Sequence, residues 1–169
     1  LFANTIVGLS EDVNLRMSYY ETTARPSFRE ASTAYLYDPV SETFFLGNPE
    51  VKPSYISNYD LRFEKFSEKN QMYAVSVFYK DFLDPIEITN ASENSPNTFL
   101  AKNTGSASVK GLEVEVRKNI FDSQNILTSL SSNITIIDAK QTMSEDEYNS
   151  KYEASKDELG DGVLENERP

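Results

Sequence analysis

The sequence of 169 residues contains no cysteine and no histidine. Without cysteine there are no disulfide frameworks and no thiol nucleophiles, and without histidine there are no imidazole bases and none of the usual zinc sites. His-dependent serine proteases are excluded for the same reason. No apolar run approaches the roughly 18 to 20 residues of a membrane helix, although the strands of membrane barrels carry only a weak alternating signal.

The net charge of −11 argues against nucleic acid as a partner, because phosphate binding needs clustered lysine and arginine. Much of the excess lies from Ala139 onward, where nine acids face four bases, giving −5. Asp157, Glu158 and Asp161 lack the regular spacing of a calcium loop, so we expect a solvated segment and no metal site there. No cofactor is predicted.

Apolar residues recur at every second position in stretches that read as β-strands. These strands are expected at 14–21, 56–66, 72–80, 109–118 and 126–138, with a weaker one at 1–9. We predict that the five stronger strands pair antiparallel in sequence order. One face of the sheet would then carry Leu15, Leu61, Val75, Val114 and Ile134.

The connections between these strands alternate between short and long. They run 10–13, 22–55, 67–71, 81–108, 119–125 and then from 139 to the end. An antiparallel meander with tight turns at one end and extended loops at the other is typical of an outer-membrane β-barrel. A soluble sandwich also alternates apolar and polar residues, but it has no physical reason to sort its loops in this way.

The residue types on each face fit a barrel wall as well as a solvated sheet. Charges of both signs lie at mid-strand on the polar face, such as Arg62, Glu64 and Glu113, and a wide wet lumen tolerates them. Aromatic residues lie near strand ends, as the aromatic girdles of a membrane barrel require. They are Tyr19, Tyr20, Tyr59, Phe63, Phe66, Tyr73, Tyr79 and Phe82.

Five short motifs resemble one family, in the order in which that family shows them. They are ETTARPSFRE at 21–30, GNPEVKP at 47–53, NYDLRFE at 58–64, VFYKD at 77–81, and NTG at 103–105 followed by VKGLEVE at 109–115. Together they resemble the TonB-dependent outer-membrane receptors over most of residues 13–140. Each motif also has a local explanation, such as a strand end at Pro26 or a close approach at Gly111.

The resemblance implies an all-β chain, an antiparallel up-and-down meander cut from a transmembrane barrel of about 22 strands that an N-terminal domain plugs. Such receptors of the bacterial outer membrane are not enzymes. They bind scarce nutrients (siderophore-iron, cobalamin, glycans or peptides), lie in outer-membrane lipid, and are driven by the TonB energy-transducing complex through the plug. The absence of an initiator methionine at Leu1 leads us to expect a piece of a longer chain.

On this basis residues 1–138 are expected to form barrel-wall strands, with short periplasmic turns and long extracellular loops at 22–55 and 81–108. Residues 139–169 are expected to form a mobile acidic extracellular loop. Any ligand contact is expected from the loop 22–55. Its side chains best suited to grip a polar ligand by charge, hydrogen bonding and stacking are Arg25, Arg29, Tyr35 and Tyr37.

The alternative is a soluble or surface-attached β-sandwich that binds glycan or protein as an adhesin-like module. The two can be told apart by topology, because a barrel segment pairs each strand with its chain neighbours whereas a sandwich shows Greek-key crossings. A carboxylate-based glycosidase is a third reading, but pairs such as Glu113 and Glu115 lie on a charged strand face where sequence reveals no pocket.

Overall fold

The computed structural model describes residues 1–68, 71–91, 95, 97–122, 127–142 and 167–168. Within these residues no helix is long and apolar enough to cross a membrane. The chain divides into two compact units. We call residues 1–21, 57–81 and 108–139 the wall, and residues 22–56, 82–107 and 140–169 the loop unit.

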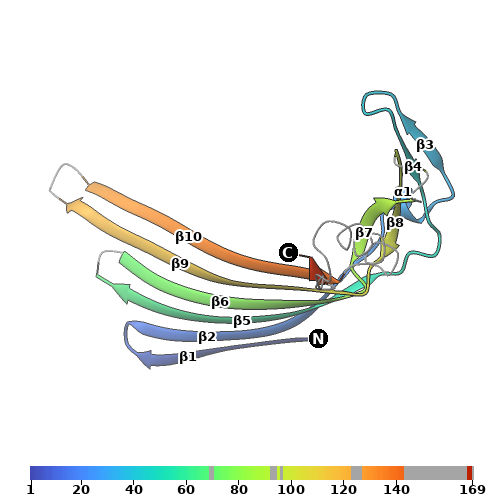
Figure 1. Ribbon diagram of the computed structural model, residues 1–169. Helices are drawn as coiled ribbons and strands as arrows, with labels where there is room; N and C mark the ends of the chain where they lie inside the picture. The colour runs from blue at the N-terminus through green and yellow to red at the C-terminus, as the bar shows by residue number, and fades with distance from the viewer. Residues whose placement is uncertain (69–70, 92–94, 96, 123–126, 143–166, 169) are drawn as a thin grey trace, which may run out of the picture. The chain divides into compact units, whose positions relative to one another are not determined.

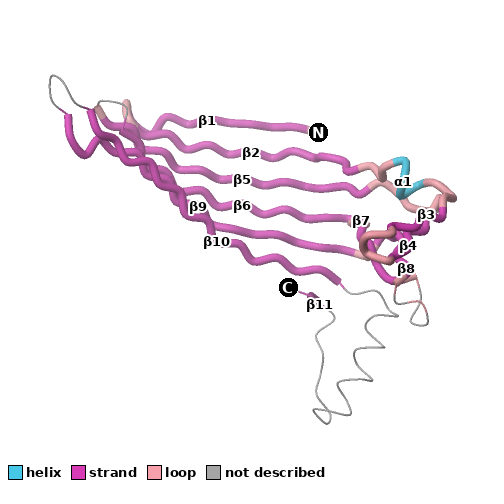
Figure 2. Tube along the Cα trace, turned by 90° about the horizontal axis from the view of Figure 1, so that it is seen from above, coloured by secondary structure: helices cyan, strands magenta, loops and turns pink. Residues whose placement is uncertain are grey.

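A seven-stranded sheet has the order β1-β2-β5-β6-β9-β10-β11 (Figures 1 and 2). Its strands are β1 (Phe2–Ser10), β2 (Val13–Ala24), β5 (Ser54–Ser67), β6 (Gln71–Leu83), β9 (Ser106–Asp122), β10 (Leu127–Thr142) and β11 (Glu167–Arg168). Within this sheet, the spatial order of the strands is the same as their order along the chain. The predicted pairing in sequence order is therefore confirmed, and this sheet has none of the crossings that a sandwich would show.

The strands extend beyond the predicted bounds. The strand predicted at 109–118, for example, is observed as Ser106–Asp122. Antiparallel pairing of backbone groups continues where the apolar alternation has ended, because each N–H and C=O still needs a partner. The pattern of side chains therefore underestimates strand length.

On the central strands β5 and β6 the apolar face is exposed and the opposite face is covered. On β5, Tyr59, Leu61 and Phe63 are 42–47% exposed, whereas Asn58 and Glu64 on the other face are only 3% and 6% exposed. On β6, Val75 and Val77 are likewise exposed while Ala74 is buried. This is the reverse of a soluble sheet, where the apolar face is covered. It fits a wall whose apolar face meets lipid and whose polar face meets a lumen.

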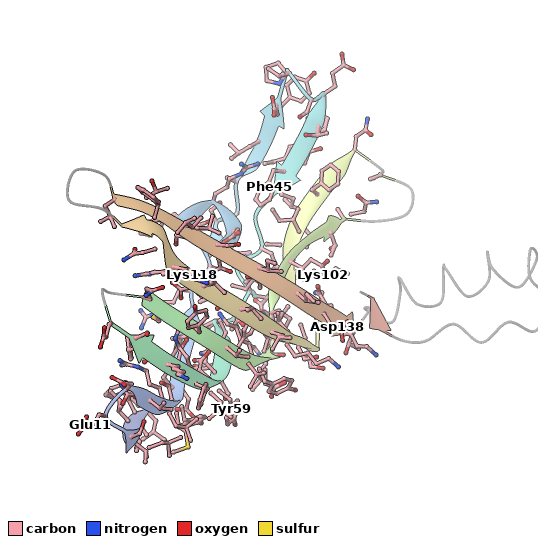
Figure 3. All side chains as sticks on the ribbon, turned by 90° about the vertical axis from the view of Figure 1, so that its left-hand side faces the viewer. Glu11, Phe45, Tyr59, Lys102, Lys118 and Asp138 are labelled. Carbon is pink, nitrogen blue, oxygen red and sulfur yellow. The ribbon has the colours of Figure 1, made fainter. Side chains whose placement is uncertain are left out.

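Three tyrosines from adjacent strands form a row on the apolar face. The ring of Tyr59 (labelled in Figure 3) lies 5.0 Å from that of Tyr19 on β2 and 6.2 Å from that of Tyr79 on β6, measured between centroids. Tyrosine has an apolar ring and a polar hydroxyl, so such a row suits a membrane–water boundary. These are three of the residues from which a girdle was predicted.

Gly111 is required by a close approach within the wall. A Cβ atom built on Gly111 would lie 2.6 Å from Cε1 of Phe78 and 2.9 Å from the carbonyl oxygen of Ile136. The ring of Phe78 on β6 thus covers the glycine of β9, which a side chain at position 111 would prevent. The sequence had indicated a close approach as one explanation of this glycine.

The loop unit contains a second sheet that the sequence did not predict. It has four strands in the order β3-β4-β8-β7, with bounds β3 (Tyr35–Asp38), β4 (Thr43–Leu46), β8 (Thr98–Asn103) and β7 (Ile86–Asn90). One helix, α1 (Phe28–Ala31), precedes it. Strands β4 and β8 pair in parallel, whereas β3–β4 and β7–β8 are antiparallel. The antiparallel meander predicted for the wall therefore does not extend to the long loops.

Both long loops contribute to the core of the loop unit. Phe45 and Val51 come from the first loop and Ala101 from the second, and all three are buried. Ile86 and Phe99 pack against them. The core beside the second sheet is therefore shared by the two loops.

The acidic segment 139–169 was predicted to be a mobile loop. Its residues 143–166 and Pro169 lie outside the described part of the chain. The flanking residues are described. Thr142 pairs with Glu167 and Gln141 with Arg168, antiparallel, so β11 adds to the seven-stranded sheet beside β10.

Replacing Gly111 by alanine in the intact protein should lower the free energy of unfolding by about 1–3 kcal/mol, the usual cost of overpacking. Unfolding of the protein in lipid vesicles by urea would measure this. In a Phe78→Ala background the ring is gone, so Gly111→Ala should cost less than it does in the wild type. Equal costs in both backgrounds would show that the ring does not cover the glycine.

The isolated polypeptide 1–169 should need detergent or associate in water. The apolar face of the wall exposes side chains such as Val77 at 45% and Ile134 at 63%, and an exposed apolar face of this kind seeks cover. Strand β1 also pairs on one side only among the described strands, and such edges recruit other strands. A compact, cooperatively unfolding monomer by light scattering without detergent would contradict this expectation.

Candidate ligand-binding surface

The register of the β3–β4 hairpin places three aromatic rings on one face of the second sheet. Tyr37 lies opposite Phe44 in the antiparallel pair. The ring of Phe44 stacks on that of Tyr35, with centroids 4.9 Å apart and an interplanar angle of 10°, and lies 4.9 Å from that of Tyr37 at 40°. We call Tyr35, Phe44 and Tyr37 the aromatic strip.

The aromatic strip is accessible. Tyr35 is 58% exposed and Tyr37 54% exposed, so more than half of each residue's surface is open to solvent. Rings of this kind can stack on a planar group of a ligand and donate a hydrogen bond to its oxygen atoms. This chemistry suits a ligand that carries both aromatic and polar groups.

A hydrogen-bonded turn holds the hairpin that carries the strip. The backbone N–H of Val40 donates to Oδ1 of Asp38 at 2.9 Å, and the hydroxyls of Ser41 and Thr43 lie 2.7 Å apart. Hydrogen bonds from the Val40 N–H, which has the larger effect, and from the Ser41 hydroxyl lower the pKa of the Asp38 carboxyl below its ordinary value. The turn therefore retains its carboxylate at neutral pH.

Arg29 lies on the opposite face of the sheet from the strip. Its guanidinium carbon is 4.0 Å from the ring centroid of Phe45, whose side chain points away from that of Phe44 because successive residues of a strand alternate. This is a cation–π contact that ties α1 to the sheet. Of the four residues predicted to contact a ligand, the structure thus brings Tyr35 and Tyr37 together, separates Arg29 from them, and leaves Arg25 exposed between β2 and α1.

The motif at 47–53 shapes the first long loop. A Cβ atom on Gly47 would collide with the carbonyl oxygen of Ser32 and lie 2.8 Å from that of Arg29. The backbone N–H of Asn48 donates to the carbonyl oxygen of Glu30 at 2.6 Å, which fixes the end of α1 against β4. Ser27 and Glu30 cap the start of the same helix reciprocally. These motif residues therefore act on the shape of the loop.

The polar face of the wall carries a ladder of ion pairs across three strand boundaries. Glu64 on β5 accepts from Nε of Arg16 on β2 at 2.6 Å and from Nε of Arg62 at 2.8 Å. Arg62 also donates to Glu115 on β9 at 2.7 Å and to the Ser76 hydroxyl on β6 at 3.0 Å. Arg117 completes the ladder on Glu115 at 2.8 Å. We call Arg16, Glu64, Arg62, Glu115 and Arg117 the ion-pair ladder.

The sequence placed Arg62, Glu64 and Glu115 on a polar face but could not pair Glu64 with Arg16 or Arg62 with Glu115, since these partners lie about fifty positions apart in the chain. Phe44 and the amides of Asn48 and Asn103 were not predicted as site residues. Asn48 and Asn103 lie within motifs that resemble the receptor family, whereas Phe44 lies outside all of these motifs. Among the described residues no group of three acidic, histidine or cysteine side chains could hold a metal ion.

A family model described as TonB dependent receptor-like, beta-barrel, matches residues 4–162. The chain belongs to this TonB-dependent receptor family. Its place is therefore in the barrel of a bacterial outer-membrane receptor, within a family of transporters that are not enzymes. None of the curated proteins compared with the chain matches it.

Solved structures of TonB-dependent receptors show the same fold. The siderophore receptor PirA from Pseudomonas aeruginosa is similar over 82% of this chain at 19% identity, with a TM-score of 0.65. A double mutant of the ferric enterobactin receptor PfeA from the same organism matches 80% of the chain at 19% identity, with a TM-score of 0.61. A PfeA variant in complex with enterobactin matches 84% at 19% identity, with a TM-score of 0.58. The chain spans 25%, 21% and 21% of these proteins, respectively.

Replacing Arg62 by alanine should destabilise the receptor barrel by about 1–3 kcal/mol, because Glu64, with a side chain only 8% exposed, and Glu115 would each lose a partner. Lys110→Ala is the control. Its ion pair with Asp138, at 3.0 Å on side chains 64% and 53% exposed, should contribute less than about 1 kcal/mol. Urea unfolding of the vesicle-embedded receptor would compare the two variants. Similar effects would contradict a special role for the ladder.

Proposed function

We propose that this chain is the part of an outer-membrane receptor that binds and imports a ferric siderophore, using energy delivered by the TonB complex through a plug domain. Residues 1–138 would supply barrel wall and the two extracellular loops. The outward apolar face would meet outer-membrane lipid.

The observation that carries the proposal is the aromatic strip on the loop unit of a chain with a receptor-barrel fold. Tyr35 and Tyr37 are more than half exposed, although their rings pack against Phe44. A surface that keeps large rings exposed yet fixed in position is prepared for a ligand, since little side-chain entropy is lost on binding. The similarity to receptors for siderophores and for ferric enterobactin favours an iron chelate over cobalamin, a glycan or a peptide.

The proposal assigns different roles to the four predicted residues. Tyr35 and Tyr37 would contact the ligand by stacking and by hydrogen bonding from their hydroxyls. Arg25, exposed beside the loop, would attract an anionic chelate. Arg29 would act mainly through Phe45, because its guanidinium already lies over that ring.

Uptake by cells that carry the intact receptor as their only siderophore receptor would test this function. We expect uptake of iron-55 bound to enterobactin or to a trihydroxamate siderophore, and its loss when the proton-motive force is dissipated. Cobalamin uptake through the same receptor, with no uptake of either iron chelate, would overturn the proposal.

The double variant Tyr35→Ala, Tyr37→Ala should raise the concentration of chelate needed for half-maximal binding by about 5-fold to 150-fold, at about 0.5–1.5 kcal/mol for each ring. Phe28→Ala removes a ring that is 98% exposed on α1 and is the matched control, with little expected change. Arg29→Ala should weaken binding less than the double tyrosine variant. Unchanged binding by Tyr35→Ala, Tyr37→Ala would exclude the strip as a contact.

A further inference from the structure

The side-chain amide of Asn103 joins two segments of the loop unit. Its Nδ2 donates to the carbonyl oxygen of Lys52 at 2.9 Å and to that of Asp84 at 2.8 Å. Its Oδ1 accepts from the backbone N–H of Lys52 at 2.8 Å. Lys52 belongs to the first long loop, whereas Asp84 and Asn103 stand at the start and near the end of the second. The Asn103 amide thus both donates to and accepts from the backbone of Lys52, as the backbone of a neighbouring strand would, and so joins the two loops.

Other contacts join the same two loops next to Asn103. Nδ2 of Asn48, in the first loop, donates to the carbonyl oxygen of Ala101, in the second, at 2.9 Å. The parallel pair of β4 and β8 then continues the connection from Leu46 and Leu100 to Phe44 and Thr98. Contacts between the two loops therefore continue from Asn103 to β4, which carries Phe44 of the aromatic strip.

The amide of Asn103 is poorly placed to contact a ligand itself. Both of its N–H donors already bond to backbone carbonyls. If one of them turned to a ligand, the carbonyl of Lys52 or of Asp84 would lose its hydrogen bond. What it can change is the position of Lys52, which follows the buried Val51 and precedes the wall strand β5. A shift at Lys52 would be transmitted through this core to Phe45 and to its neighbour Phe44.

We propose that Asn103 is a positioning residue for ligand binding. Its amide locks the two long loops into one body, and this lock holds the aromatic strip in the arrangement that binds the chelate. The proposal rests on the proposed function for its ligand, but the lock itself can be observed without any ligand. It makes the second loop a determinant of affinity even though the strip lies wholly on the first.

Asn103→Asp in the intact receptor is the sharpest variant. It keeps the size of the side chain, removes both N–H donors, and places a carboxylate oxygen against two carbonyl oxygens. The matched control is Asn90→Asp, the same chemical change on an exposed residue of β7 in the same loop. Each variant is compared with the wild type in detergent by hydrogen exchange of the peptides that cover 44–52 and 98–104.

We expect Asn103→Asp to speed exchange at least tenfold in both peptides, because the first loop loses its lock as well as the second. The concentration of ferric enterobactin, or of the ferric trihydroxamate if that is the chelate imported, needed for half-maximal uptake should rise at least fivefold. The maximal rate per receptor should change little. Asn90→Asp should alter neither measurement.

A cross-link tests whether the lock, rather than the amide, is what binding needs. Leu46 and Leu100 lie directly opposite each other on β4 and β8, and the chain has no other cysteine. Oxidised Leu46→Cys, Leu100→Cys in the Asn103→Asp background should restore slow exchange and most of the affinity. The reduced form should restore neither. If Asn103 instead contacted the ligand directly, the disulfide would hold the loops together but would not restore the affinity.

The outcomes separate the two proposals. Faster exchange confined to 98–104, or none, would overturn the lock whatever the ligand. Faster exchange in both loops with unchanged uptake, or a cross-link that restores exchange but not affinity, would overturn the positioning role. If neither iron chelate is imported by the wild type, the proposed function fails, while the exchange measurements still decide whether Asn103 locks the loops.

Discussion

The wall depends on one constraint: inside a hydrocarbon layer there is no water to satisfy a peptide N–H or C=O, so each must bond within the sheet. Sequential antiparallel pairing of β1, β2, β5, β6, β9 and β10 meets this requirement along the described strands. The same constraint explains why pairing continues past the apolar residues at the strand ends. It also accounts for Gly111 beside Phe78. A larger residue at position 111 would fit next to the ring only if the strands bent or separated, and that would break backbone hydrogen bonds.

Once the backbone is paired, the two faces of the wall solve opposite problems. The outward side chains can remain exposed because lipid is their solvent, which is why Ile134 and Val77 have no cover in this chain. The inward charges cannot rely on lipid, and Arg62 satisfies Glu64 on its own strand β5 and Glu115 on β9, beyond β6. The backbone hydrogen bonds already join each strand to the next. The ion-pair ladder adds side-chain links in the same direction, across the strands.

Sequence alone could predict the wall because its signal is local. A period of two over eight or more residues identifies a strand and its outward face, as at Leu61 and Val75. The second sheet escaped because β3 and β4 have only four residues each, too few to show a period, and because the β4–β8 pair joins residues more than fifty positions apart. For the same reason Arg29 could be recognised as a binding type of residue, while its stacking on Phe45 could not be foreseen.

The parallel pairing of β4 with β8 bears on how such a receptor can change its specificity in evolution. Extracellular loops are usually regarded as interchangeable parts that can lengthen, shorten or be replaced one at a time. Here the two long loops share a sheet, a core and the hydrogen bonds of the Asn103 amide, so that neither is a module without the other. Recombination that exchanged one of them would bring together halves that do not fit. With the strip as the contact surface that we propose, new specificity is more accessible through point changes on it, or by inheriting both loops together.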